Sequence, residues 1–196
     1  LGLEPLFKYL LNEVKSSQEA INFAKDFLNE DIDSSKEAIE KSLDILAEDI
    51  SNNIKARNIV RRDGMIRARL KVNQKDDSKN VYQTYYDFNK KIKDLKSYQI
   101  LAINRGEKEG ALTVKVEFSD DYNKRLISDL YDSSNSYQRE LIDKSVNDAY
   151  KRLILPSITT ELRNYLTDMA ENESIKVFSS NLKPYLLQKP IKGKTV

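Results

Sequence analysis

Residues 102–118, AINRGEKEGALTVKVEF, show the pattern most suggestive of chemistry, because two glycines enclose a short charged run. Such glycines could cradle a phosphate, and Glu107 with Glu109 could form an acid/base pair. A phosphate-binding glycine loop, however, follows a strand and opens a helix. Here the hydrophobic pattern predicts a helix before the glycines and a strand after them. We therefore interpret Gly106 as a helix C-cap and Gly110 as a turn glycine, both with positive φ, and place the two glutamates in solvent.

Composition excludes several catalytic classes. The 196 residues include neither Cys nor His, which rules out disulfides, thiolate zinc sites, and Ser-His-Asp or Cys-His catalysis within this chain. Pairs of carboxylates occur in predicted loops or caps, with no third type of metal ligand nearby. We expect no catalytic residue, no metal and no cofactor, and therefore no enzymatic activity.

The strongest charge asymmetry lies in residues 55–75, KARNIVRRDGMIRARLKVNQK, where Asp63 is the only acid. Clustered cations are typical of surfaces that contact nucleic-acid phosphates. The candidate residues are Lys55, Arg57, Arg61, Arg62, Arg67, Arg69 and Lys71, with Lys75 at the end of the segment. The alternative is a solvated face, or one neutralised by acidic helices such as that around Glu48. We favour the alternative, because the net charge is only +2.

An aromatic cluster occupies residues 81–88, VYQTYYDF, with no clear secondary-structure signal. Its rings could stack on nucleic-acid bases. Such clusters more often pack in a core or dock a loop, and we favour packing.

Helices dominate the elements that must position these residues. Ser16 with Glu19 and Ser34 with Glu37 form capping boxes, and the second opens a long helix that should run to about Arg62. After residue 120 the pattern is again helical, with a break or kink at Pro156 and strain or a bend at Pro184.

Two segments change to a period of two. Apolar and polar residues alternate over 66–72 and over 112–118, which predicts strands with one apolar and one charged face. The predicted fold class is mainly α with a small antiparallel β element (α+β) covered on one side by helices. The predicted parts are a helical subdomain (1–64), a small α/β insert (65–120) and a helical segment (121–196) leading into a further domain.

No apolar run approaches the roughly 20 residues that span a bilayer, and no signal peptide opens the chain. We expect a cytoplasmic, monomeric fragment without a membrane partner. The chain starts at Leu1 without Met and ends in PIKGKTV, so we expect a piece of a longer protein.

Several stretches resemble bacterial transcription accessory proteins of the Tex family. They are GLEPL at the start, AIEKSLDILAEDIS, YYDF, LAINRGEKEGALTVKVEF, DAYKRLILPSITTELR (148–163), and IKVFSSNLKPYLL followed by GKTV. The resemblance covers essentially the whole chain. The family usually has Pro-Ser-His-Arg where this chain has Lys96, Ser97, Tyr98 and Gln99, and Pro184 interrupts a helix usually free of proline.

The resemblance implies a large cytoplasmic nucleic-acid-binding protein, similar in architecture to the core of a eukaryotic transcription elongation factor. It places an RNase H-like fold, helix-hairpin-helix modules and a nucleic-acid-binding OB-fold beyond Val196, and it maps no binding or catalytic residue onto this chain. Our first hypothesis is a structural scaffold within a protein that binds RNA or DNA and engages the transcription machinery. The second is that residues 55–75 themselves contact nucleic acid.

Overall fold

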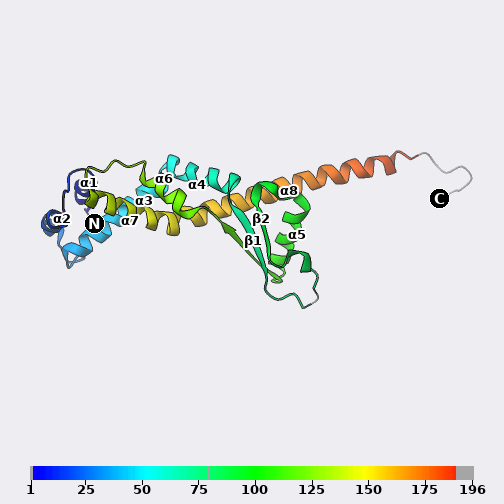
Figure 1. Cartoon of the computed structure of the whole chain (residues 1–196), viewed down its shortest axis with the longest axis horizontal. Helices are drawn as coiled ribbons and strands as arrows, with labels where there is room; N and C mark the ends of the chain where they lie inside the picture. The colour runs from blue at the N-terminus through cyan, green and yellow to red at the C-terminus, as the bar shows by residue number, and fades with distance from the viewer. Residues whose placement is uncertain (1, 79, 189–196) are drawn as a thin grey trace, which may run out of the picture. The chain divides into compact units, whose positions relative to one another are not determined.

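The computed structural model describes residues 2–78 and 80–188 (Figure 1). Their fold is mainly α-helical with a small antiparallel sheet, as the sequence predicts. The chain forms two compact units, a helical unit (Leu1–Ala68, Phe118–Thr160) and a sheet unit (Arg69–Glu117, Glu161–Val196). Each unit uses two separate stretches of chain, and the division into three consecutive parts stays a prediction. The GKTV sequence lies outside the described residues.

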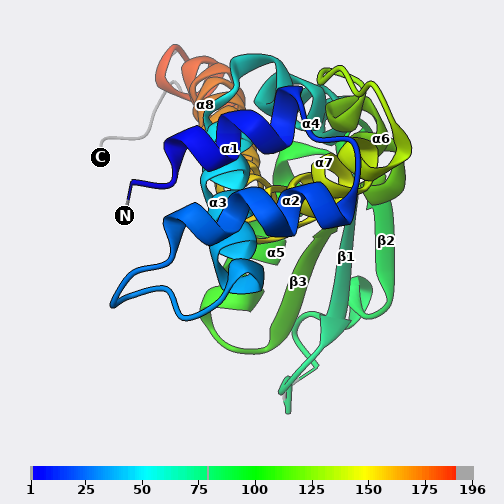
Figure 2. The ribbon, with the colours of Figure 1, turned by 90° about the vertical axis from the view of Figure 1, so that its left-hand side faces the viewer.

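The helical unit is assembled around a central helix, α3 (Ser35–Asn52). Figure 2 shows α1 and α2 lying against it. One apolar cluster takes Leu43 from the first half of α3, and a second takes Leu46 and Ile50 from the last half. The other elements of this unit are α1 (Glu4–Asn12), α2 (Ser17–Ala24), η1 (Lys25–Phe27), α4 (Ile54–Ile66), α6 (Asp120–Ser128), α7 (Ser136–Asp148), η4 (Ala149–Ile154) and the start of α8 (Leu155–Leu186).

Both predicted capping boxes are confirmed. Ser16 Oγ accepts a hydrogen bond from the Glu19 N–H, and Ser34 Oγ accepts one from the Glu37 N–H. The two glutamate side chains accept from the backbone N–H groups just before their capping serines. Local sequence therefore determines where α2 and α3 begin.

The prediction of one helix from 34 to about 62 is wrong, because Asn53 separates α3 from α4. Asn53 has φ −68° and ψ 117°, outside the helical range, and its Oδ1 accepts from the N–H groups of Lys55 and Ala56. An Asn N-cap thus starts a new helix. Ile54, which the continuous pattern would bury, is 74% exposed.

Of the break or kink predicted at Pro156, the break is wrong, since α8 runs through this residue. A π turn, η4, directly precedes α8, and the Leu155 N–H donates to Tyr150 O, five residues earlier. The backbone hydrogen bonds just before Pro156 therefore do not follow the i→i−4 pattern that a proline would interrupt. The same helix passes through Pro184 before it ends at Leu186.

The sheet unit contains β1 (Arg69–Gln74), β2 (Phe88–Lys91) and β3 (Leu112–Glu117) in the order β2-β1-β3, all antiparallel. Two of these strands are predicted by sequence alternation, although the first begins at Arg69 because Ile66 still belongs to α4. Figure 1 shows α5 (Ser97–Lys108) along one side of the sheet. The unit also contains η2 (Gln83–Tyr85), η3 (Ile92–Asp94) and most of α8.

The two glycines of residues 102–118 have different roles. Gly110 has φ +76° and forms the predicted turn into β3. Gly106, predicted as a C-cap with positive φ, instead lies inside α5. A Cβ there would stand 2.6 Å from Leu112 Cδ1 and 3.0 Å from Tyr82 Cδ1, so any larger residue would force these neighbouring side chains to shift.

Among the described residues, no helix is both long and apolar enough to traverse a lipid bilayer.

Candidate nucleic-acid interface

The structure distributes the predicted basic residues over both units. Lys55, Arg57, Arg61 and Arg62 lie on α4 of the helical unit, whereas Arg69 and Lys71 lie on β1 of the sheet unit. Arg67 stands between these groups, just after α4. The basic segment 55–75 therefore contributes to two separate candidate surfaces, one on α4 and one on β1.

On α4 the cations differ in how they are held. An Nη atom of Arg57 donates to Ser157 Oγ across 2.8 Å, and an Nη atom of Arg61 donates to Asn58 Oδ1 across 2.6 Å. Lys55 and Arg62 are exposed and two helical turns apart, on the same face of α4. These two side chains are the ones on this helix best placed to reach a phosphate.

Arg67 has a structural partner. Its Nε donates to Asp63 Oδ1 across 2.8 Å, and its guanidinium carbon lies 3.9 Å from the centre of the Tyr122 ring. Asp63 is completely buried, and its second oxygen accepts from the Ser119 N–H and from Asn123 Nδ2. The Tyr122 and Asp63 contacts raise the pKa of Arg67. Arg67 therefore compensates a buried charge.

The aromatic cluster is held by a buried carboxylate. Asp77 accepts from the N–H groups of Val81 and Tyr82, and the Tyr86 hydroxyl donates to it across 2.8 Å. Burial, followed by the bond to Asp77, raises the pKa of Tyr86 to about 12. The Tyr82 ring is buried, and its hydroxyl donates to Glu109 Oε2 across 2.7 Å. These contacts support packing as the role of Tyr82 and Tyr86.

The remaining two predicted residues, Arg69 and Lys71, point to the solvent face of the sheet, because the alternating residues Leu70 and Val72 are buried. Arg69 donates to the side chain of Asn89 across 2.6 Å and to its backbone oxygen across 3.0 Å.

The strand register adds two cations that the basic segment does not contain. Lys91 of β2 stands directly opposite Arg69, and Lys115 of β3 stands directly opposite Lys71. Alternation already placed Lys115 on the charged face of its strand. Lys91 had no such signal, because the β2 sequence FNKK does not alternate.

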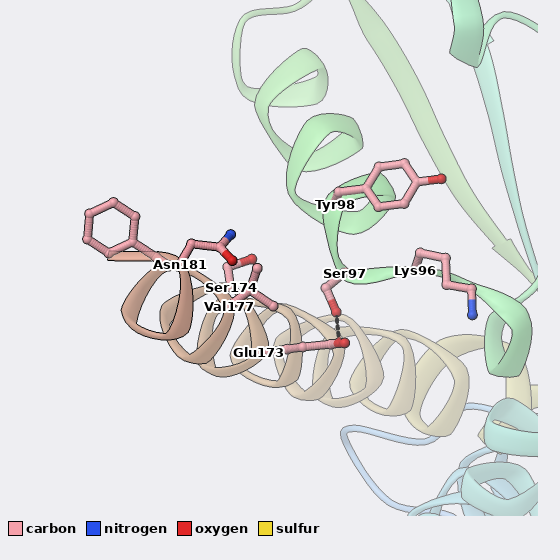
Figure 3. Close-up of a pocket in the computed structure, with 8 residues that line it drawn as sticks. Lys96, Ser97, Tyr98, Glu173, Ser174, Val177 and Asn181 are labelled. Carbon is pink, nitrogen blue, oxygen red and sulfur yellow. Dashed lines mark hydrogen bonds between the residues drawn. The ribbon is translucent and has the colours of Figure 1, made fainter. Parts of the chain in front are cut away.

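The sheet unit also holds a pocket of about 430 Å³ between α5 and α8 (Figure 3). Ser97, at the start of α5, donates a hydrogen bond to Glu173 of α8. The Lys96 N–H donates to Gln99 Oε1 across 3.1 Å, so the departure from the family's Pro-Ser-His-Arg pattern still gives a capped helix start. The pocket lining combines Lys96, Ser97, Tyr98, Glu173, Ser174, Val177, Phe178 and Asn181.

The described residues contain no group of three or more Asp, Glu, His or Cys side chains placed to hold a metal ion.

Comparison with known proteins identifies the family. A family model described as Tex central region-like matches residues 15–178. The chain belongs to the Tex family. Its relatives include an uncharacterized protein of Bacillus subtilis, 36% identical, with 100% of this chain and 28% of the relative covered. The S1 RNA-binding domain-containing protein 1 of Homo sapiens is 39% identical over 64% of this chain and 13% of its own length.

A protein named transcriptional accessory protein Tex, from Neisseria gonorrhoeae, is 26% identical over 96% of this Tex-family chain. That alignment covers 26% of the relative. The chain thus spans between about an eighth and a little over a quarter of these relatives. The matches to the Bacillus subtilis and Neisseria gonorrhoeae proteins reach across both structural units.

Proposed function

We propose that this chain is the structural scaffold region of a nucleic-acid-binding transcription accessory protein, and that the principal contacts with RNA or DNA come from parts outside these 196 residues. The observation that carries the proposal is the match to the Tex central region over residues 15–178. The names of two relatives add support, since one denotes an RNA-binding domain and the other a transcriptional accessory role.

The internal organisation supports a scaffold role. The first turn of α8 contributes Ile158 to the core of the helical unit. The later residues of the helix belong to the sheet unit, where Leu162 and Leu166 are buried. Arg163 forms an ion pair with Glu107 of α5, and Asn104 Nδ2 donates to Thr167 across 2.8 Å. Residues of α8 are therefore buried within each of the two units.

We further propose that the region has no catalytic activity of its own and that the protein acts in the cytoplasm, with the transcription machinery as its partner. The absence of Cys and His removes the residue types used most often as nucleophile and general base. A hydrolase assay of the full-length protein with Mg²⁺ or Mn²⁺ tests the first point, because turnover lost on substitution within this region would contradict it.

The second candidate function is direct phosphate contact by the basic segment. Exposed Lys55 and Arg62 on one face of α4 favour it. Under the scaffold proposal, changing both to Gln in the full-length protein should alter the dissociation constant for single-stranded RNA or duplex DNA by less than about twofold. Each lost phosphate contact would instead flatten the slope of log K against log salt by about 0.7 for single strands or 0.9 for duplex DNA.

A matched pair of variants separates the two functions. Lys8→Gln with Lys36→Gln removes the same charge from exposed positions on α1 and α3. A tenfold loss of affinity in the α4 variant but not in this control would promote direct contact over the scaffold role. Failure of the unaltered full-length protein to bind either nucleic acid at low salt would refute the proposed function itself.

A further inference from the structure

The solvent face of the three-stranded sheet concentrates positive charge. Residues directly opposite one another in an antiparallel sheet share a face, so the register places Arg69, Lys71, Lys91 and Lys115 together. We call these four residues the basic sheet face. Glu117 is the acid within the strands on the same face, opposite Arg69. Asp87, just before β2, also reaches this face, because its Oδ1 accepts a hydrogen bond from Asn73 Nδ2 across 3.3 Å.

Two of the cross-strand pairs join like charges. Arg69 opposes Lys91, and Lys71 opposes Lys115. Directly opposed like charges destabilise a sheet, because their Cα atoms are only about 5 Å apart. Folding alone therefore gives no reason for these pairings, whereas an anionic partner would offset the repulsion.

The ion pair on this face neutralises little of the charge. Glu117 Oε1 lies 3.6 Å from Lys71 Nζ, a long contact between partly exposed groups that stabilises weakly. Arg69 is held by the neutral Asn89. Within the described residues, no ion pair engages Lys91 or Lys115.

Protection of sheet edges accounts for only part of the pattern. Lysines on edge strands discourage pairing with another chain, and Lys91 and Lys115 lie on the edge strands β2 and β3. Arg69 and Lys71 lie on the central strand β1, where no edge needs protection. The central positions therefore require another explanation.

The other side chains on this face indicate the kind of partner. Asn73, Asn89 and Thr113 share it, and such polar groups contact phosphate and sugar together with Arg and Lys. The face has no aromatic or aliphatic side chain, and therefore lacks the apolar anchors that dominate protein–protein interfaces. It also lacks rings on which bases could stack.

We propose that the basic sheet face is an accessory binding surface for the sugar–phosphate backbone of nucleic acid, with no preference for sequence. Successive cations on β1 are about 7 Å apart along the strand, a spacing comparable to that of successive phosphates in an extended single strand. This inference rests on the proposed function, because the full-length protein must bind nucleic acid for an accessory surface to contribute.

The test uses the full-length protein with Lys91→Gln and Lys115→Gln combined. Neither side chain has an ion-pair partner among the described residues, so the change removes charge without breaking an ion pair. Binding to single-stranded RNA and to duplex DNA is measured at several salt concentrations. Two controls are Lys8→Gln with Lys36→Gln, which removes equal charge elsewhere, and Lys91→Arg with Lys115→Arg, which keeps the charge.

The expected result is a slope of log K against log salt flattened by about 1.4 for single-stranded RNA, or about 1.8 for duplex DNA, if both residues contact phosphates. The melting temperature of the Gln variant should stay the same or rise, because two like-charge pairs are relieved. Both controls should bind like the unaltered protein.

An unchanged slope in the Gln variant, beside normal binding by the unaltered protein, would overturn the inference and leave the proposed function standing. Absence of binding by the unaltered protein would overturn both. Polyglutamate serves as a second probe. Weakened binding of polyglutamate with unchanged RNA binding would assign the face to an acidic protein and likewise overturn the inference.

Discussion

The Nε atom of Arg67 donates a hydrogen bond to the buried Oδ1 of Asp63 across 2.8 Å. The other oxygen of Asp63 accepts from the Ser119 N–H and from Asn123. A cation that the sequence offers as a candidate for phosphate contact thus stabilises a carboxylate inside the helical unit. The same carboxylate joins the end of α4 to the start of α6.

We predict that Asp63→Ala lowers the free energy of unfolding by about 3 kcal/mol, because three donors lose their acceptor in a buried site. Asp121→Ala, at an exposed position on α6, should change it by less than about 0.5 kcal/mol. Urea denaturation followed by circular dichroism measures both. Similar midpoints for the two variants would contradict the structural role of Asp63.

The two faces of β3 should respond differently to the same side chain. Val116 is buried opposite Leu70, whereas its neighbour Lys115 is exposed. Val116→Asp should unfold or severely destabilise the sheet unit, since an unpaired carboxylate in an apolar site costs several kcal/mol. Lys115→Asp should change stability by about 0.5 kcal/mol or less. Equal thermal shifts would refute the assignment of the strand faces.

Gly106→Ala should destabilise the protein by about 1–3 kcal/mol, although alanine is the better helix former. The added methyl group would meet the Leu112 side chain at 2.6 Å. A double-mutant cycle with Leu112→Ala tests this cause directly, because the smaller residue makes room for the methyl group. The two effects should combine to less than their sum, and strict additivity would show that the contact is not responsible.

Tyr86 should contribute to the stability of the protein in alkali. Its pKa is raised from 10.0 to about 12 in the folded state, by burial and by the bond to Asp77. A raised folded-state pKa gives stability that is complete below pH 10 and is lost as the pH rises towards about 12. Tyr86→Phe should therefore flatten the loss of stability in that window, whereas Tyr98→Phe, at an exposed position, should not. Urea midpoints at a series of pH values measure the difference.

Sequence patterns predict those helix starts and strands that are determined by residues close to one another in the chain. The capping serines Ser16 and Ser34 lie within three residues of the groups they bind, and the alternation of β3 follows from one buried face. The sequence does not reveal the break at Asn53, because isoleucines continue at helical spacing on both sides of it, although Ile54 is exposed.

The features that sequence did not predict depend on distant partners. Strand β2 exists because Phe88–Lys91 pairs with β1, and its sequence has no alternation of its own. The role of Gly106 depends on Leu112 of the adjacent strand. For the same reason, only the strand register shows that Lys91 belongs to the candidate interface. Only the burial of Asp63 shows that Arg67 has a structural role instead.

The antiparallel pairing of β1 with β3 has a consequence for how this region can change over evolutionary time. Arg69 and Glu117 are the first and last strand residues, and they stand directly opposite each other. The segment between them therefore begins and ends at two adjacent positions, one on β1 and one on β3. Insertions, deletions or exchange between these two points can alter the loops and the charge of the sheet without lengthening the connection from α4 to α6, which Asp63 already closes through Ser119.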